Sequence, residues 1–256
     1  PADLTATVEA GVTLQGLQQE LAQGGEFLPV EAPLAERATI GGILAGNATG
    51  PLRASYGLPR DWLIGIGVVS AEGVETKAGG KVVKNVTGYD LNKLYAGSMG
   101  TLAVIVEATF KLAPLPADAG TLVAAFSSMP EGIEAGRRLL RQTAAAQGVQ
   151  VVESQAGRRL GSDSGALFPE SLTSGAAVAL AFFSGRPSAV QRRLEEGTGL
   201  LREAGAKQVA RLDQEEGRLL LRRLADLGWS VESRPYLGIK LGVPPTAVAQ
   251  VAGSCR

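Results

Sequence analysis

The sequence predicts an α+β fold in two domains, the second with a ferredoxin-like arrangement. Before residue 113 the chain has the patterns of short strands and tight turns, and glycine is concentrated between Gly41 and Gly100. The segment Ala113–Ala117, which contains two prolines, then interrupts regular structure. After it, strand patterns alternate with helices that begin at capping residues. We therefore expect domains at residues 1–116 and 117–256.

The first domain is expected to contain few regular elements. In order they are a strand at Leu4–Glu9, a helix from the Thr13 cap to the Gly24-Gly25 stop, and strands at Trp62–Ser70 and Thr101–Leu112. Leu14, Leu17 and Leu21 give the helix one apolar face. The last strand alternates apolar with other residues over its whole length, which is the period-2 pattern of a half-buried strand. Gly65-Ile66-Gly67 lies inside an apolar strand and is interpreted as structural.

The second domain shows a longer series of elements. The expected strands are Thr121–Phe126, Val149–Glu153, Ala176–Phe183, Lys207–Arg211 and Tyr236–Gly242, and the expected helices begin at Ser128, Ser188, Asp213 and Thr246. Ser128 and Ser188 are each followed three residues later by Glu or Gln, the spacing of a capping box. The central order β-α-β-β-α-β is that of the ferredoxin-like fold.

Composition excludes several classes of chemistry. The 256 residues include no histidine and one cysteine, Cys255. This excludes Ser-His-Asp and Cys-His nucleophiles, histidine or cysteine metal sites and the usual anchors of covalent flavin or haem. A single thiol fits a reducing, cytoplasmic setting. Residues 1–120 carry a net charge of −4 and the remainder +4, too little for a nucleic-acid stripe. The longest apolar run, Ala176–Phe183, is too short to span a bilayer.

The first candidate site is the glycine-rich run from Thr39 to Gly50. Gly41 and Gly42 remove side chains where a backbone would approach a flat or phosphorylated ligand, and N–H groups freed there can bind anionic oxygens. Asn47 offers donors and an acceptor to the edge of a heterocycle. The run is neither a P-loop nor a dinucleotide fingerprint. On spacing alone, the glycines could equally serve only to make tight turns.

The second candidate site is a polar string, Lys84–Leu94, followed by the turn Gly97-Ser98-Met99-Gly100-Thr101. Turns of this kind expose backbone amides beside a rigid strand, which is a common way to hold a cofactor. A purely structural turn would have the same composition, so spacing leaves both interpretations open.

The run from Pro1 to about Pro116 resembles the second half of the FAD-binding domain of the vanillyl-alcohol-oxidase (PCMH-type) flavoprotein family. Within that family it is most similar to the E subunits of bacterial glycolate oxidases, chiefly through the string Lys84–Asp90. The matching pieces are Ala38-Thr39-Ile40-Gly41-Gly42, Asn47-Ala48-Thr49-Gly50, Tyr56-Gly57 with Arg60-Asp61, the run Gly79–Asp90, and Gly97-Ser98-Met99-Gly100-Thr101-Leu102.

The resemblance implies a noncovalent FAD site. Thr39–Gly42 would line the flavin and pyrophosphate with backbone groups, Asn47 and Gly50 would lie near the isoalloxazine, and the Ala103–Ile105 backbone would approach the adenosine. The residues implied to contact the cofactor are Thr39, Ile40, Gly41, Gly42, Asn47, Gly50, Tyr56, Gly57, Asp61, Gly97, Ser98, Gly100, Thr101, Val104 and Ile105.

The resemblance also implies FAD-dependent oxidation of glycolate or another small 2-hydroxy acid. Such chemistry needs a base, and the usual histidine is absent, which leaves Asp61, Asp90, Lys84 and Tyr89 without an assigned catalytic role. We therefore expect a subunit that is inactive alone and works with the D-type flavin subunit and the iron–sulfur F-type subunit of a glycolate oxidase complex. Any contact with the inner face of the membrane would be made through these partners. The alternative is a flavin-free scaffold or interaction subunit that keeps the fold.

Two departures from the family pattern shape the expectation for the cofactor. In the family a loop of Arg-Gly-Gly-Gly-Thr type precedes the region that matches Pro1, and this sequence has no such loop. The C-terminal domain is also shorter than the family's, so we expect it to be incomplete. Because the missing loop supplies pyrophosphate donors, we expect the chain as given to bind FAD weakly or to lack it.

Overall fold

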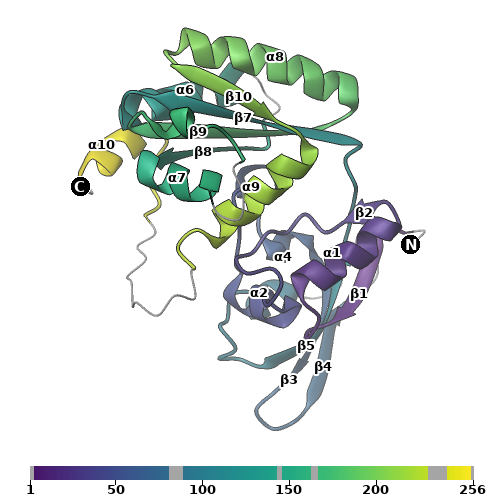
Figure 1. The fold of residues 1–256 in the computed structure, drawn as a ribbon. Coiled ribbons are helices and arrows are strands. Elements are labelled where there is room, and N and C mark those ends of the chain that lie inside the picture. The colour runs from purple at the N-terminus through teal and green to yellow at the C-terminus, as the bar shows by residue number, and fades with distance from the viewer. Residues whose placement is uncertain (1–2, 81–88, 143–145, 163–166, 230–240, 255–256) are drawn as a thin grey trace. The chain divides into compact units, whose positions relative to one another are not determined.

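The computed structural model describes residues 3–80, 89–142, 146–162, 167–229 and 241–254. The chain divides into two compact units, Pro1–Leu115 and Pro116–Arg256, each with its own sheet (Figure 1). The division falls in the segment that contains Pro114 and Pro116. Tyr236–Lys240, most of the last expected strand, lies outside the described residues.

The first unit is built on a four-stranded antiparallel sheet with the order β1-β5-β3-β4. The strands are β1 (Thr5–Glu9), β3 (Leu63–Val69), β4 (Glu75–Gly79) and β5 (Val104–Lys111). A second, two-stranded sheet joins β2 (Glu26–Phe27) to β6 (Ala113–Pro114). Since β5 pairs with both β1 and β3, it occupies the interior of the larger sheet and its Ala108 and Phe110 are fully buried.

Helices pack on this sheet and close the core. They are α1 (Leu14–Gln23), α2 (Ile40–Gly46), α3 (Arg53–Tyr56), α4 (Pro59–Trp62) and α5 (Asn92–Tyr95). The prediction for α1 is confirmed, because the Thr13 hydroxyl accepts the Gly16 N–H and the three leucines are buried. By contrast, most elements between Arg37 and Gly100 were expected to be strands and tight turns, and this is wrong: the four short helices α2 to α5 lie there beside the strands β3 and β4.

The alternation predicted for the last strand of this unit is only partly right. Regular structure in β5 begins at Val104 rather than at Thr101, and Val104 is 65% exposed whereas Phe110 is 1% exposed. The two residues would share a face in an unbroken strand. A register shift against β3 between Gly67 and Val68 marks a bulge that moves Val104 to the opposite face.

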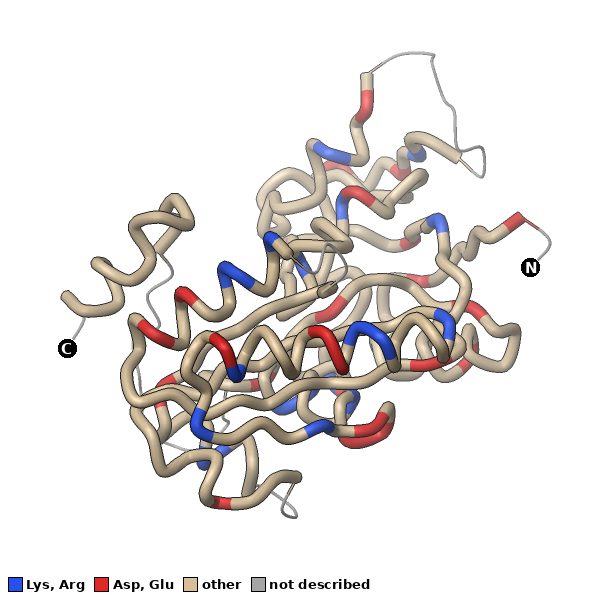
Figure 2. Tube along the Cα trace, turned by 90° about the horizontal axis from the view of Figure 1, so that it is seen from above, with Lys and Arg blue, Asp and Glu red and all other residues tan. Residues whose placement is uncertain are grey.

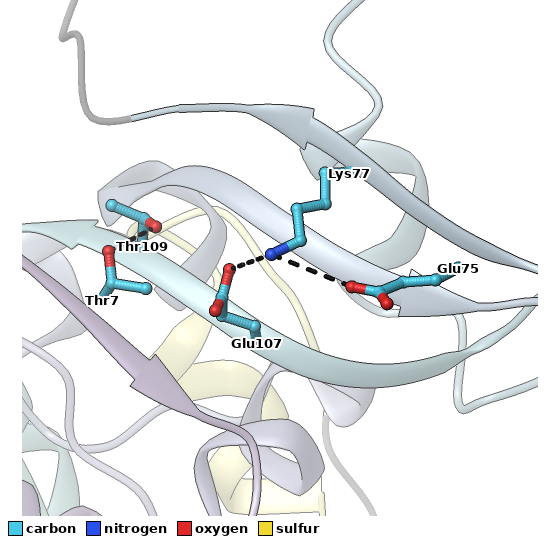
Figure 3. A network of polar contacts seen from close by, with 5 residues as sticks. All are labelled: Thr7, Glu75, Lys77, Glu107 and Thr109. Carbon is cyan, nitrogen blue, oxygen red and sulfur yellow. Dashed lines mark hydrogen bonds and ion pairs between the residues drawn. The ribbon is translucent and has the colours of Figure 1, made fainter.

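Glycines in β3 leave room for a polar network across the sheet (Figure 3). Gly67 is paired with Lys77 of β4 on one side and with Glu107 of β5 on the other. Because Gly67 has no side chain, the Lys77 ammonium reaches across it to Glu107, at 3.2 Å. Thr7 and Thr109 form a hydrogen bond of 2.9 Å between paired strands. The structural interpretation of this glycine is thus supported.

The second unit has the ferredoxin-like topology that the sequence predicts. Its strands are β7 (Asp118–Phe126), β8 (Gly148–Glu153), β9 (Ala177–Gly185) and β10 (Gln208–Leu212), all antiparallel, in the order β10-β7-β9-β8. The crossover helices are α6 (Met129–Gln142) and α8 (Pro187–Glu203). With its strands numbered in chain order, this sheet reads 4-1-3-2, the arrangement of β-α-β-β-α-β folds.

Helices cover both faces of this sheet (Figure 1). Residues of α6 and α8 share a core with Leu122, Ala124 and Phe126 of β7. The opposite face is covered by α7 (Ser154–Ser162), the 3-10 helix η1 (Glu170–Thr173) and α9 (Gln214–Asp226). A sheet buried on both faces explains why β7 and β9 have continuous apolar runs rather than alternation. The helix α10 (Val248–Ser254) packs near α6.

The helix starts in this unit were predicted with mixed success. Asp213 caps α9 in a reciprocal capping box with Glu216, as expected. Ser128 accepts the Glu131 N–H at the start of α6. The capping box expected at Ser188 is wrong, because α8 begins at Pro187 and no side chain caps it.

Two glycines in α8 differ in their surroundings and give a direct test of the packing. A Cβ at Gly197 would lie 2.8 Å from Leu122 Cδ1 in the fully buried core, whereas a Cβ at Gly199 would meet nothing within 4 Å. We expect Gly197→Ala to lower the free energy of unfolding by about 1–3 kcal/mol through overpacking. Gly199→Ala should raise it by about 0.5–1 kcal/mol, because alanine favours the helix. Urea denaturation of both variants measures the difference, and equal effects would contradict the packing described.

Candidate functional site

Several residues of the predicted site lie on the short helix α2 or at its two ends. At its start, the Thr39 hydroxyl accepts the Gly42 N–H at 3.3 Å. The Ile40 and Gly41 N–H groups donate to the carbonyls of Val12 and Ala10, each at 2.9 Å. The N–H groups of Ile40, Gly41 and Gly42 are therefore all engaged within the protein. The donors are used because tertiary contacts turn the glycine pair into a helix start. That Thr39–Gly42 lines the flavin and pyrophosphate with backbone groups stays a prediction.

The two glycines of the pair have different roles. A Cβ at Gly41 would lie 2.9 Å from the Ala10 Cβ, so Gly41 is needed for α2 to pack against the chain that follows β1. Gly42 is exposed, and a Cβ there would meet only the Thr39 hydroxyl, at 3.3 Å. Ile40 is a core residue, 1% exposed. Of these three residues, only Gly42 offers open backbone surface to a ligand.

The other end of α2 joins the two candidate segments. Asn47 caps the helix in the left-handed conformation, with φ at 46°. The Gly97 N–H donates to the Leu44 carbonyl at 2.9 Å and the Met99 N–H donates to the Ala45 carbonyl at 2.8 Å. The structure therefore brings Asn47 and the Gly97–Gly100 turn together, although they are fifty residues apart in the chain.

Two polar atoms at this junction are buried without a hydrogen-bond partner among the described residues, Asn47 Oδ1 and Ser98 Oγ. A buried polar atom left unpaired costs about 1–3 kcal/mol. Proteins rarely retain such atoms unless a ligand or water pairs with them. An amide oxygen and a hydroxyl can pair with the polar edge of a heterocycle, so these two residues fit the cofactor that the sequence implies.

The strand β5 offers a backbone edge beside this junction. Its pairing with β1 ends at Glu107, opposite Glu9, so Ala103–Ile105 extends past the end of β1. No strand in the described part of the chain pairs with this edge. Val104 is exposed and Ile105 is buried. The placement agrees with the approach of an adenosine expected here, which stays a prediction. At the preceding turn, Gly100 has φ at 74° and the Thr101 hydroxyl donates to the Ser98 carbonyl.

The predicted residues around Tyr56 make structural contacts. The Tyr56 ring meets Phe27 edge-on at 5.8 Å between centroids, and its carbonyl accepts the Trp62 indole N–H at 2.7 Å. Asp61 caps α4 by accepting the Leu58 N–H at 2.8 Å. Gly57 has φ at 77°, and a Cβ there would lie 2.7 Å from Asp61 Oδ2. Glycine is therefore required at this turn whether or not a ligand binds.

None of the proton-transfer candidates in the described residues lies in an enclosed site. Asp90 forms an ion pair with Lys93 at 2.7 Å, and Tyr89 is 95% exposed. The Asp61 carboxylate is exposed and serves as a cap. Lys84, together with most of the string that includes it, falls outside the described residues. In the same described residues, no group of three or more acidic, histidine or cysteine side chains could hold a metal ion.

A carboxyl group that the sequence did not single out lies beside these residues. Glu31 lines a cavity of about 10 Å³ together with Gly50, Tyr56 and Gly57. Its Oε2 accepts the Leu52 N–H at 2.8 Å. Burial raises the pKa of Glu31 from 4.5 to about 7, opposed by the bond from Leu52. The sequence marks this residue only as a single acid within the otherwise apolar run of residues 28–32.

Lys and Arg positions alternate with Asp and Glu positions along the described chain trace (Figure 2). Arg137 and Arg141 both pair with Glu134, at 2.8 and 3.1 Å. Within the described ranges, no helix is both long and apolar enough to cross a membrane.

The raised pKa of Glu31 predicts how stability depends on pH. Since the folded protein holds this proton up to about pH 7 and the unfolded chain releases it near 4.5, stability should fall as pH rises between these values. The loss amounts to at most about 3 kcal/mol. Glu31→Gln keeps an acceptor for Leu52 without ionising, so it should match wild type at pH 4 and exceed it at pH 8. Urea melts at both pH values measure this, and parallel pH dependence in the two proteins would contradict it.

Comparison with known proteins finds a family that is similar to part of the first unit. The family described as "FAD binding domain" matches residues 1–79. The chain is 39% identical to the glycolate oxidase subunit GlcD of Bacillus subtilis, over 50% of this chain and 27% of the relative. It is 38% identical to the glycolate oxidase subunit GlcE of Escherichia coli, over 45% of this chain and 33% of that relative. A D-lactate dehydrogenase of Anaerostipes hadrus is 30% identical, over 79% of this chain and 43% of that relative. The chain thus spans less than half the length of these relatives.

Solved structures share the fold at low sequence identity. An alkyldihydroxyacetonephosphate synthase matches with a TM-score of 0.70 at 16% identity, over 88% of this chain and 44% of that chain. A p-cresol methylhydroxylase with substrate bound matches with a TM-score of 0.65 at 18% identity, over 89% of this chain and 51% of that chain. These neighbours confirm the predicted α+β fold class. Similar identities to GlcD and GlcE mean that the comparison does not separate the two kinds of subunit.

Proposed function

We propose that the first unit, which matches the FAD binding domain family over residues 1–79, holds FAD noncovalently in a PCMH-type 2-hydroxy acid oxidoreductase. Relatives named as glycolate oxidase subunits, D-lactate dehydrogenases and D-2-hydroxyglutarate dehydrogenases support this class of substrate. Within the class, we propose the role of an E-type subunit in a glycolate oxidase complex with D-type and iron–sulfur F-type partners.

The observation that carries the proposal is the meeting of three features around α2. Gly42 leaves open backbone surface on the helix, and the β5 edge at Ala103–Ile105 lacks a described strand partner. Asn47 Oδ1 and Ser98 Oγ, at the far end of the helix, are buried without partners among the described residues. A flat, extended ligand with polar edges would pair these atoms and lie on the open surface.

Bound FAD would accept the hydride removed from the carbon that carries the substrate hydroxyl. The chain's own contribution would be to bind and orient it, through the Asn47 amide, the Ser98 hydroxyl and the β5 backbone. A base must also take the hydroxyl proton. The chain has no histidine, and Asp61, Asp90 and Tyr89 are exposed. Because the partly buried Glu31 carboxyl group is bonded to the Leu52 N–H, we propose that a partner subunit supplies the base.

Ser98→Ala tests the unpartnered hydroxyl. Removing a buried group that has no partner should raise the free energy of unfolding of the flavin-free protein by about 1 kcal/mol. The same change should weaken FAD binding, because one hydrogen bond to the ligand is lost. Thermal melts and flavin fluorescence titration measure the two effects. A variant that is less stable without flavin, with unchanged affinity, would contradict the assignment.

Gly42→Ala tests the open surface of α2. In a full-length protein that includes the family's pyrophosphate loop, we expect melting within about 3 °C of wild type, equivalent to about 1 kcal/mol. Flavin content should fall about tenfold or more, since the methyl group occupies the ligand's contact surface. Absorbance ratios and melts measure both.

Gly65→Ala is the matched control. Its Cβ would lie 3.0 Å from the Gly80 N and 3.2 Å from the Thr109 Cβ, so it should lower stability without selective loss of flavin. Equal flavin content in wild type and Gly42→Ala would remove the support for a ligand surface. A full-length wild-type protein that binds no flavin would favour the flavin-free scaffold instead.

A further inference from the structure

The segment Thr49–Gly57, which follows α2, lies against the carboxyl group of Glu31. This residue belongs to the segment before α2, and its Oε2 accepts the Leu52 N–H at 2.8 Å. A Cβ at Gly50 would lie only 2.5 Å from the Glu31 Cβ and 2.9 Å from its Oε2. Gly50 therefore lets the Thr49–Gly57 segment lie directly against the carboxyl group.

The surroundings offer little to a negative charge at this position. Arg53 and Tyr56 are the titratable groups that line the cavity with Glu31, and the Asp61 carboxylate lies beyond Gly57. No ion pair joins Arg53 to Glu31 in the part of the chain that the structure describes. The cavity of about 10 Å³ has room for about one water. An ionised carboxylate would therefore be poorly solvated here, consistent with the raised pKa of Glu31.

We propose that Glu31 is a positioning residue that holds the Thr49–Gly57 segment closed while its carboxyl group is protonated and releases the segment when it ionises. The closed segment carries Gly50, Tyr56 and Gly57, all predicted to lie near the cofactor. The effect on flavin binding rests on the proposed function, whereas the effect of Glu31 on the position of the Thr49–Gly57 segment does not. The Leu52 N–H favours the ionised carboxylate, but desolvation in the closed segment opposes ionisation more strongly. Ionisation therefore shifts the equilibrium toward an open segment in which water solvates the carboxylate.

Hydrogen exchange of the backbone amides tests the hold without any cofactor. In the wild-type chain, protection of residues 49–57, corrected for intrinsic exchange rates, should fall about tenfold between pH 6 and pH 8.5. Protection of the β5 amides should change much less. Glu31→Gln should keep the segment protected at both pH values. Glu36→Gln removes an exposed carboxylate from the segment before α2 that also contains Glu31, and it should behave as wild type.

Two results would overturn the proposal. One is equal protection of the wild-type segment at pH 6 and pH 8.5, which needs no variant. The other is an equal pH-dependent loss in Glu31→Gln and wild type. Fluorescence titration with FAD then separates this inference from the proposed function. Affinity that falls about tenfold with pH in wild type but not in Glu31→Gln supports both. Because this chain alone is expected to bind FAD weakly, the titration uses a chain extended by the family's pyrophosphate loop. Absence of FAD binding in that protein, with the exchange difference intact, overturns only the flavin proposal.

Discussion

The first unit depends on backbone hydrogen bonds that hold both ends of α2. The carbonyls of Ala10 and Val12 accept N–H groups at its start, and the N–H groups of Gly97 and Met99 bond carbonyls at its end. Each bond contributes only about 1 kcal/mol net, but unpaired groups at a buried helix end cost more than that. The helix is thus stable only where three segments far apart in the chain meet, and the candidate site consists of those meeting points.

The second unit could be predicted largely from local sequence, because its signals are local. Asp213 and Glu216 identify a helix start by themselves, and the strand order follows from the β-α-β-β-α-β pattern. The covering of the second face of the sheet was not predicted. It depends on close approach of glycines in α7 and α9 to side chains of β9 and β7, such as Gly157 to Val178. Such contacts between elements leave no periodic signal in a short, glycine-containing helix.

The first unit was harder to predict for the same physical reason. Glycine disfavours helices by about 1 kcal/mol, so local propensity predicts turns where α2 forms. The residues of the candidate site were named from resemblance, but their roles needed the coordinates. Gly41 and Gly57 are fixed by packing and dihedral angle, whereas Gly42 is open. Glu31 could not be identified from spacing, because its burial depends on a loop twenty residues away. Lys84 stays a prediction, since it lies outside the described residues.

Several features of the site are unfavourable for the chain by itself. Asn47 and Ser98 bury polar atoms without described partners, and Glu31 keeps a carboxyl group where its charge is poorly solvated. Local conflicts of this kind concentrate where a protein binds something, because binding compensates for the lost stability. The second unit shows the opposite pattern, with its inner strands buried among apolar side chains. The contrast supports the proposal that a ligand binds to the first unit, and it does so on energetic grounds.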